Sequence, residues 1–254
     1  GDDPSSRIYV KGKSRDCEEV GIGFRLRELP ASTAEQKLLD LVDELNKDSE
    51  VHGILVQLPL PPHIDKKKVT ASIKPQKDVD GLHPYNVGKL WLGMHDFEND
   101  LLPCTPKGIV KLLDYYGIEL GGKLAVIINR SDLVGKPLSK LFLDRNATVV
   151  ICHSKTQGLE KYTLAADVLV SAVGRRPSFV VSEDIVKEGA VVVDVGMNYV
   201  GGKLQGDVDF ESVKEKVSYI TPVPGGVGPM TRVMLLYNAL IATKLAEGSG
   251  EIKL

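Results

Sequence analysis

The chain has 254 residues, 43% of them apolar and 26% charged, which is enough for one large domain or two ordinary domains with a real core. Its 32 basic and 34 acidic side chains give a formal net charge of −2, whereas a nucleic-acid-binding protein carries a clear basic excess. No apolar run approaches the roughly 20 residues that span a bilayer. We therefore expect no nucleic-acid partner and no membrane partner.

Three widely spaced cysteines, Cys17, Cys104 and Cys152, form no Cys-x-x-Cys pair. This pattern indicates reduced thiols in a cytoplasmic compartment rather than a disulfide framework or a zinc site. The chain opens on a polar, turn-like Gly-Asp-Asp-Pro-Ser-Ser string instead of a signal peptide. Because a strong helix follows that turn directly, we expect a further segment upstream, and organelle targeting stays open.

The first half alternates helical and strand-like segments. Apolar spacing and capping residues predict three helices, over residues 7–20, 33–48 and 65–72. Short apolar runs predict strands over residues 24–29 and 53–58, and the second run stops at a cluster of prolines. Residues 74–103 look rich in loops.

The second half has the pattern of a parallel sheet covered by helices. Runs rich in Val and Ile, without polar alternation, predict buried strands over residues 124–128, 148–151, 168–172 and 190–195. A proline in its first turn opens a predicted long helix over residues 229–246. The fold class is therefore α/β with two lobes, and the cleft between the lobes is the expected site.

Tyr9, Lys13 and Gln57 are the first candidate site residues. Tyr9 and Lys13 lie four residues apart, on one face of the first helix. The commoner interpretation of such spacing is a surface pair with no function. The functional interpretation is an aromatic ring for stacking beside an amine that transfers protons. Gln57 ends a buried strand, where α/β sheets gather ligand groups. In the structural interpretation, the side-chain amide of Gln57 only hydrogen-bonds loop backbone. In the functional one, this amide orients an amine and, because it is neutral, does not hold that amine as a salt-bridged ammonium.

Asp78 and Asp80 are carboxylates two residues apart, so both face one side of an extended segment. No neighbouring cluster of His, Cys or further acids completes a metal site, and we predict no metal. Asp80-Gly81 is typical of a turn. A carboxylate that accepts two N–H bonds from a heterocycle is the functional alternative, and the two interpretations have equal weight.

A dinucleotide site is indicated where residues 129–137 follow a strand and open a helix, although the G-x-G-x-x-G pattern is absent. The next strand ends in residues 152–156, where NAD-binding proteins commonly hold an acid. Ser154 and Lys155 stand there instead, with Arg130 at the end of the adjacent strand. These groups attract a 2′-phosphate, which favours NADP.

Residues 221–231 combine three glycines and three prolines in eleven residues. The structural interpretation is a tight connector into the last helix, and the functional one is a wall of bare backbone that approaches a flat ring.

Seven strings in this order resemble the methylenetetrahydrofolate dehydrogenase/cyclohydrolase family, over essentially the whole chain. VQLPLP and PVPGGVGPMT are the most specific of them. The strings are Tyr9-x-x-x-Lys13, VQLPLP at 56–61, KDVDG at 77–81, PCTPKG at 103–108, RSxxVGxP at 130–137, CHSKT at 152–156 and PVPGGVGPMT at 222–231.

The resemblance implies a small α/β folate-binding catalytic domain over residues 1–103, completed by a C-terminal helix over residues 234–254. It implies a Rossmann-like, parallel-sheet NADP-binding domain over residues 104–233, and a homodimer formed through that domain.

It also implies roles for single residues. Lys13 would be the catalytic amine, with Gln57 hydrogen-bonded to it. Tyr9 would stack on the folate and Asp80 would bind its pterin ring.

On the cofactor side, Arg130 and Ser154 would hold the 2′-phosphate of NADP. Ser131 would lie near the cofactor phosphates, and Gly225 and Gly226 would help line the substrate cleft. Two departures stand out. The family commonly has Gly where this chain has Asn129, so a side chain could crowd or rebond the cofactor loop. The family also usually carries a helix and a strand before the opening turn.

The implied reaction oxidises 5,10-methylene-tetrahydrofolate to 5,10-methenyl-tetrahydrofolate with NADP, then hydrolyses it to 10-formyl-tetrahydrofolate, in one-carbon metabolism and purine biosynthesis. A monofunctional dehydrogenase of the same family is the nearest alternative. A non-catalytic nucleotide-binding regulatory protein would leave Tyr9, Lys13, Gln57 and Asp80 unexplained. An NAD-dependent hydroxy-acid dehydrogenase would need a catalytic His-Asp pair or a substrate-binding Arg, and the sequence shows no such arrangement.

Overall fold

The computed structural model describes residue 1 and residues 4–248. The chain forms two compact units: unit 1 is Gly1–Cys104 together with the segment from Met234 onward, and unit 2 is Thr105–Val233. The last helix, α9 (Val227–Glu247), begins in unit 2 and ends in unit 1. Residues 249–254, the end of the predicted terminal helix, lie outside the described residues.

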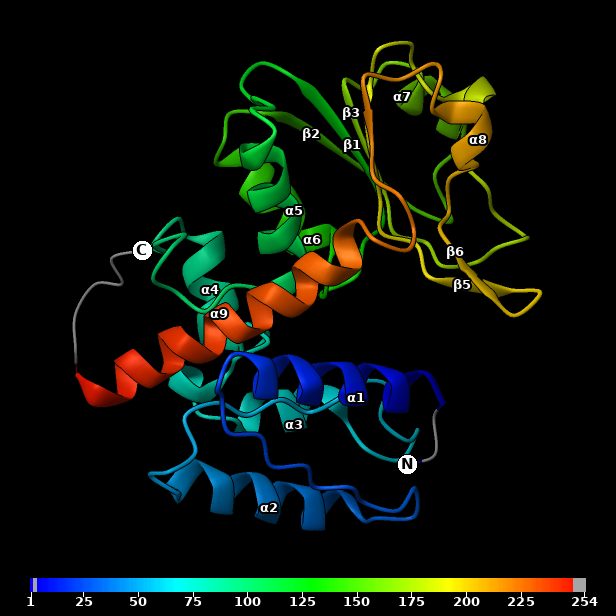
Figure 1. Cartoon of the computed structure of the whole chain (residues 1–254). Coiled ribbons are helices and arrows are strands. Elements are labelled where there is room, and N and C mark those ends of the chain that lie inside the picture. Colours follow the sequence, from blue (N-terminus) through cyan, green and yellow to red (C-terminus); the bar gives the residue numbers. More distant parts are fainter. Residues whose placement is uncertain (2–3, 249–254) are drawn as a thin grey trace. The chain divides into compact units, whose positions relative to one another are not determined.

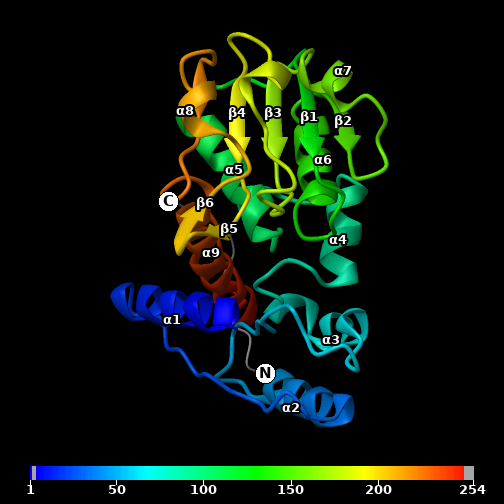
Figure 2. The same ribbon diagram turned by 90° about the vertical axis from the view of Figure 1, so that its right-hand side faces the viewer.

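A five-stranded parallel sheet forms the centre of unit 2, with its strands in the order β2-β1-β3-β4-β7. Figure 2 shows β2, β1, β3 and β4 side by side. All of β3 is buried, and so are β1 and β4 apart from their first residues, which explains why these runs lack polar alternation. The predicted parallel sheet is confirmed, and β7 is an additional strand. The strands are β1 (Leu124–Ile128), β2 (Thr148–Cys152), β3 (Val168–Ser171), β4 (Val191–Asp194) and β7 (Tyr219–Ile220).

Helices cover both faces of this sheet, with α5 on one face and α7 and α8 on the other (Figure 1). An antiparallel hairpin of β5 (Asn198–Val200) and β6 (Lys203–Gln205) was not predicted. Its two-residue turn is Gly201-Gly202, both with positive φ, which is a recognisable hairpin signal. The helical segments of unit 2 are α5 (Cys104–Tyr115), α6 (Gly135–Leu143), α7 (Leu159–Thr163), η2 (Glu183–Ile185) and α8 (Phe210–Val213).

Unit 1 is built from helices and long connections. An apolar cluster lies beneath α2 and α3, and Asp65 caps α3 by accepting the N–H of Lys67 at 2.8 Å. The Nζ of Lys77 donates to the carbonyls of Leu45 and Asp48, so it satisfies carbonyl groups at the end of α2. The helical segments are α1 (Pro4–Glu19), α2 (Glu35–Lys47), α3 (Lys66–Ser72), η1 (Pro75–Lys77) and α4 (Pro84–Trp91).

Two strand predictions in unit 1 were wrong. Residues 24–29 form no regular element, and within residues 53–58 only Ile54 makes a bridge, to Asp78. Ile54 donates its N–H to the carbonyl of Lys77 at 2.7 Å, but a ladder needs a neighbouring strand over several residues, and no described segment supplies one. The stretch predicted to be loop-rich contains α4, whose N-cap His83 accepts the N–H of Tyr85 through Nδ1.

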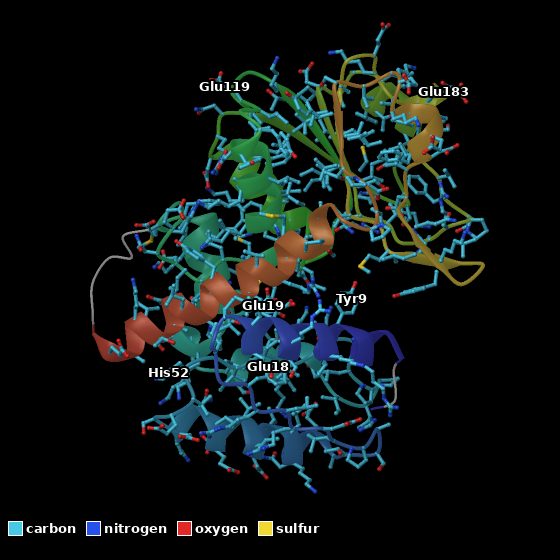
Figure 3. The ribbon with its side chains drawn as sticks, viewed as in Figure 1. Tyr9, Glu18, Glu19, His52, Glu119 and Glu183 are labelled. Atoms are coloured by element: carbon cyan, nitrogen blue, oxygen red, sulfur yellow. The ribbon has the colours of Figure 1, made fainter. Side chains whose placement is uncertain are left out.

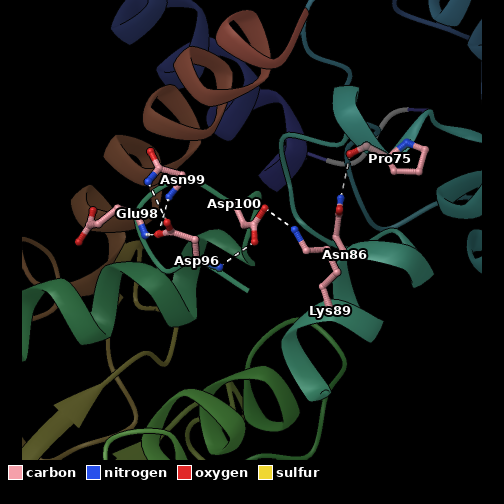
Figure 4. A network of polar contacts seen from close by, with 7 residues as sticks. All are labelled: Pro75, Asn86, Lys89, Asp96, Glu98, Asn99 and Asp100. Atoms are coloured by element: carbon pink, nitrogen blue, oxygen red, sulfur yellow. Dashed lines mark hydrogen bonds and ion pairs between the residues drawn. The ribbon is translucent and has the colours of Figure 1, made fainter. Parts of the chain in front are cut away.

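Side-chain braces hold the connections of unit 1 (Figure 4). Asp100 accepts from Lys89 Nζ at 2.6 Å and from the N–H of Asp96, while Asp96 accepts from the N–H groups of Glu98 and Asn99. Side-chain carboxylates thus accept the backbone N–H groups that would pair with neighbouring strands in a sheet. The last part of α9 completes a second apolar cluster of unit 1, formed by Val79, Leu101, Cys104, Met234, Leu235, Ile241 and Ala242.

Candidate functional site

Lys13 and Gln57 meet in unit 1, although they are 44 residues apart in the chain. The Nζ of Lys13 donates to Oε1 of Gln57 at 3.0 Å, and Nε2 of Gln57 donates to the carbonyl of Leu58 at 2.9 Å. Both side chains are half-buried. Cys17 follows Lys13 by one helical turn and is buried, which fixes the rotation of α1 so that Lys13 points inward.

Two further features position this part of α1. Gly21, with φ of 76°, ends the helix, and the N–H of Ile22 donates back to the carbonyl of Cys17 at 2.8 Å. Tyr9 is half-buried and lies one turn before Lys13, on the side of α1 that faces away from α2 (Figure 3). An aromatic ring and an amine thus occupy neighbouring positions on one helix face.

Asp80 lies within the electrostatic reach of Lys13. Burial raises the pKa of the Asp80 carboxyl above its ordinary value, while the positive charge of Lys13 opposes the rise and the nearby Asp78 carboxylate adds to it. Lys13 is therefore linked to both of the other predicted polar residues of unit 1, Gln57 by a hydrogen bond and Asp80 by charge.

The two neighbouring carboxylates have different surroundings. Asp78 is fully buried, and its Oδ2 accepts from the N–H of His83 at 2.7 Å and from Nδ2 of Asn86 at 2.9 Å. It braces the connection into α4, whereas Asp80 as a whole residue is half-buried. Within residues 1 and 4–248, no group of three or more His, Cys, Asp or Glu residues could hold a metal ion.

Cys104 and Asn238 support Asp80, and neither was predicted to do so. Nδ2 of Asn238, a fully buried residue, donates to the carbonyls of Val79 and Leu102 at 2.9 and 2.8 Å. Cys104 donates through Sγ to the carbonyl of Val79 at 3.3 Å, and its thiol also acts to lower the pKa of the Asp80 carboxyl, against the larger effect of burial. A polar residue on the buried face of the last helix was the available signal for Asn238.

In unit 2, the predicted cofactor residues gather at the carboxyl ends of the strands. Ile128 pairs with Cys152 in the β1–β2 register, and Arg130 and Ser154 each follow that pair by two residues. Both side chains are exposed. The parallel register therefore brings a guanidinium and a hydroxyl to the same edge of the sheet, with no acid between Cys152 and Thr156.

The loop from β1 into α6 is closed by one side chain. Oδ1 of Asn129 accepts from the N–H and Oγ of Ser131 at 2.8 and 2.7 Å, and from the N–H of Gly135 at 3.0 Å. Nδ2 of Asn129 donates to the carbonyl of Ala172, directly after β3, at 2.5 Å. Since β2 and β3 lie on opposite sides of β1, this bond spans the point where the strand order reverses, where open α/β sheets bind ligands.

Gly225 and Gly226 lie in the loop between β7 and α9, and they differ in their need for glycine. Gly225 has φ of 108°, which a side chain rarely tolerates. A Cβ on Gly226 would lie 2.6 Å from the carbonyl oxygen of Pro222, so the loop itself requires glycine there. Part of this glycine-rich string therefore has a structural cause.

Two buried carboxylates tie the strand ends of unit 2 together. Asp207 accepts from Ser171 Oγ and from the N–H groups of Val173 and Gly174, and Asp194 accepts the N–H groups of Gly196, Asp207 and Val208. Burial raises the pKa of Asp194 to about 6, although these backbone donors favour its ionised form.

Two described properties bear on the chain's class. Cys17, Cys104 and Cys152 are buried, and none of them belongs to a disulfide. No helix in residues 1 and 4–248 is both long and apolar enough to cross a membrane.

Comparison with known proteins gives a consistent answer. Residues 1–80 match the model of the tetrahydrofolate dehydrogenase/cyclohydrolase catalytic domain, and residues 103–247 match that of the NAD(P)-binding domain of the same family. The bifunctional protein FolD of Francisella philomiragia is 57% identical over 238 residues, which cover 94% of this chain and 83% of that protein.

Solved structures agree. The bifunctional FolD methylenetetrahydrofolate dehydrogenase/cyclohydrolase of Campylobacter jejuni superposes with a TM-score of 0.92 at 52% identity, over 96% of this chain and 86% of that one. The FolD of Trypanosoma brucei, solved with NADP cofactor and an inhibitor, gives a TM-score of 0.91 at 38% identity, over 97% and 85%. The chain belongs to the tetrahydrofolate dehydrogenase/cyclohydrolase family.

Proposed function

We propose that the protein oxidises 5,10-methylene-tetrahydrofolate to 5,10-methenyl-tetrahydrofolate with NADP and hydrolyses the product to 10-formyl-tetrahydrofolate. Unit 1 binds the folate and carries the hydrolytic residues, and unit 2 binds NADP. The hydrogen bond of 3.0 Å between Lys13 Nζ and Gln57 Oε1 carries the assignment, because oxidation alone does not require a proton-handling amine.

In the hydrolytic step, the oxygen of water bonds to the bridging carbon and loses a proton. The bond from that carbon to N5 then breaks and N5 takes up a proton, while the hydroxyl on the carbon releases its remaining proton to water and becomes the formyl C=O on N10. The Lys13 amine accepts the first proton and returns the second. Gln57 orients the amine through Oε1, and because an amide is neutral at every pH it does not hold Lys13 as a permanent ammonium, as a carboxylate would.

Tyr9 and Asp80 position the folate. The Tyr9 ring offers a face for stacking, and the Asp80 carboxyl offers oxygen atoms to N–H groups of the pterin. Burial of Asp80 strengthens these bonds, because fewer water molecules compete with the pterin for its carboxyl oxygens.

The edge of the unit 2 sheet fits NADP. The exposed Arg130 and Ser154 can donate to a 2′-phosphate, and no carboxylate stands between residues 152 and 156 to repel it. Ser131 lies at the start of the β1–α6 loop, near the cofactor phosphates. Gly225 and Gly226 present backbone without side chains to the folate and the nicotinamide ring. NADP, when bound, accepts the hydride.

Substitution of Lys13 tests the assignment. We expect Lys13→Ala to lower the hydrolysis of methenyl-tetrahydrofolate by roughly 100- to 10,000-fold, the range for loss of a general acid–base group. Decay of the methenyl-folate absorbance measures this step without any nucleotide. Lys11→Ala, an exposed position on the same helix, is the matched control and should hydrolyse at the parent rate.

Two outcomes would decide against parts of the proposal. Parent-rate hydrolysis by Lys13→Ala would exclude Lys13 as the proton-transferring group. A parent protein that forms NADPH from methylene-tetrahydrofolate but does not hydrolyse the methenyl compound would be a monofunctional dehydrogenase.

We propose as well that the protein acts in the cytoplasm, as a homodimer formed through unit 2, and supplies one-carbon units to purine biosynthesis. Its three free cysteines support a reducing compartment. Light scattering on the purified protein should give twice the mass of one chain, and a mass of one chain would contradict the dimer.

A further inference from the structure

Asn129 makes four hydrogen bonds with one amide group. Its neighbours fix the orientation of that amide: Ser131 N–H, Ser131 Oγ and Gly135 N–H can donate, while the Ala172 carbonyl can only accept. Only the orientation with Oδ1 toward the loop and Nδ2 toward β3 satisfies all four partners. The side chain therefore links two strand ends through a defined set of bonds.

The loop closed by Asn129 is tight in its backbone as well. Val134 donates its N–H to Ser131 Oγ at 3.1 Å, and Lys136 donates its N–H to the Ser131 carbonyl at 3.1 Å. A Cβ on Gly135 would lie 2.1 Å from the Asn129 carbonyl oxygen, so the two backbones touch. Residues 129–136 thus form a compact turn that depends on Asn129 at its centre.

The strand end to which Asn129 is tied is itself fixed. The two residues after Ala172, Val173 and Gly174, donate their N–H groups to the buried Asp207 carboxylate at 2.6 and 2.9 Å. Ser171 Oγ also donates to Asp207, at 2.8 Å. Asn129 therefore ties the β1–α6 loop to a strand end that is itself held by three hydrogen bonds to Asp207.

We infer that Asn129 is a positioning residue that orders the β1–α6 loop before NADP binds. With glycine at this position, these four bonds would be absent and the backbone would sample more conformations, so the ligand would have to order the loop itself. The inference rests on the proposed function of unit 2. Asn129 acts on Ser131 and the loop backbone, not on the 2′-phosphate, so it should serve NADP and NAD alike.

Asn129→Gly is the direct test. We expect the KM for NADP and the KM for NAD to rise together, by roughly tenfold, because each binding event then includes the cost of ordering the loop. The kcat of oxidation and the ratio of the two KM values should stay unchanged. Hydrolysis of methenyl-tetrahydrofolate, measured without nucleotide, should also stay at the parent rate and so reports that unit 1 is intact, while the unchanged kcat of oxidation reports that unit 2 is folded.

Asn146→Gly is the matched control. Asn146 is exposed in the same unit and has φ of 61°, which glycine adopts freely, so neither KM should change. Hydrogen exchange adds a readout that does not depend on activity. In the parent protein without NADP, the amides of Ser131 and Gly135 should already be protected. In Asn129→Gly, they should become protected only when NADP is added.

The outcomes separate the two claims. If the parent shows no NADP-dependent oxidation, the proposed function fails. If the parent oxidises its substrate and Asn129→Gly has an unchanged or lower KM for NADP, only the role of Asn129 is overturned. Rapid exchange of the Ser131 and Gly135 amides in the parent without NADP would overturn that role as well.

Discussion

The two units of the chain hold their candidate site residues by different means. In unit 2, parallel register brings Arg130 and Ser154 to one edge of a sheet whose β1 strand is buried apart from its first residue. In unit 1, the described residues contain one isolated bridge, and the positions of Lys13, Gln57 and Asp80 depend on helix ends and side-chain hydrogen bonds. Residues at the end of a hydrogen-bonded sheet take their positions from the strands. Residues on irregular connections need side-chain hydrogen bonds of their own to hold them in place.

Because side-chain hydrogen bonds hold the connections of unit 1, we expect its stability to depend on single polar side chains outside the proposed site. The largest effect is expected at Asp78. Asp78→Ala removes the acceptor for the His83 N–H and the Asn86 amide, and it leaves buried donors unsatisfied, so the free energy of unfolding should fall by about 3–5 kcal/mol. Trp91, the only tryptophan in the chain, lies in α4 of unit 1, so its fluorescence follows denaturant unfolding of this unit.

Asp78→Asn is the matched control. Within the described residues, nothing donates to the buried Oδ1 of Asp78, so a side chain with a single carbonyl oxygen can still accept both bonds. It should retain most of the stability that Asp78→Ala loses. Equal losses in both variants would show that the negative charge, and not the two hydrogen bonds, supports α4.

The second prediction concerns unit 2, where a carboxylate braces the strand ends. Because burial raises the pKa of Asp194 from 3.8 to about 6, the folded protein keeps a proton that the unfolded chain has already lost between these values. The contribution of Asp194 to stability is therefore fully present below about pH 4 and is lost as the pH rises through about 6. The loss should reach about 3 kcal/mol at most, since one pKa unit corresponds to about 1.4 kcal/mol.

Unfolding free energies from about pH 4 to about pH 7, followed by circular dichroism, measure this slope. Asp194→Asn should remove it, because an amide does not titrate. Asp184→Asn, an exposed position in η2, should keep the parent slope. A slope that survives in Asp194→Asn would assign the titration to another group.

The smallest of these effects separates the two nicotinamide cofactors at the sheet edge. Arg130→Ala should raise the KM for NADP by roughly 10- to 100-fold, as expected for loss of a charge-assisted bond to phosphate, and leave the KM for NAD unchanged. Initial rates of oxidation with each cofactor test this. Lys214→Ala, exposed in the same unit, controls for the loss of one positive charge. An equal rise for both cofactors would place Arg130 elsewhere than at the 2′-phosphate.

The same contrast explains what could be predicted from the sequence. The Val- and Ile-rich runs predicted β1 to β4, because strands buried on both faces have a plain signature. The similar run at residues 53–58 did not form a strand, because strand formation depends on a neighbour that the run itself does not specify. α4 was missed because it is eight residues long and contains Gly88.

The site residues also differed in how far the sequence could predict them. Lys13 and Gln57 were found through motifs, and the structure brings them together. Spacing alone did not separate Asp78 from Asp80, and only the family resemblance assigned the pterin to Asp80. In the structure, Asp78 is fully buried and Asp80 is half-buried. The polar Asn238 on the buried face of the last helix was a signal of some buried partner, but that partner, the Val79 carbonyl, lies 159 residues away and no local pattern identifies it.

α9 has a consequence for biosynthesis. Unit 2 is a single continuous stretch, whereas unit 1 is interrupted and recovers Asn238 and its apolar neighbours only from the end of the chain. Since the ribosome makes residues 105–233 before residue 238, the cofactor unit can fold while translation continues. The catalytic unit waits for the last helix, so a chain stopped shortly before Asn238 would leave the Asp80 segment without its brace.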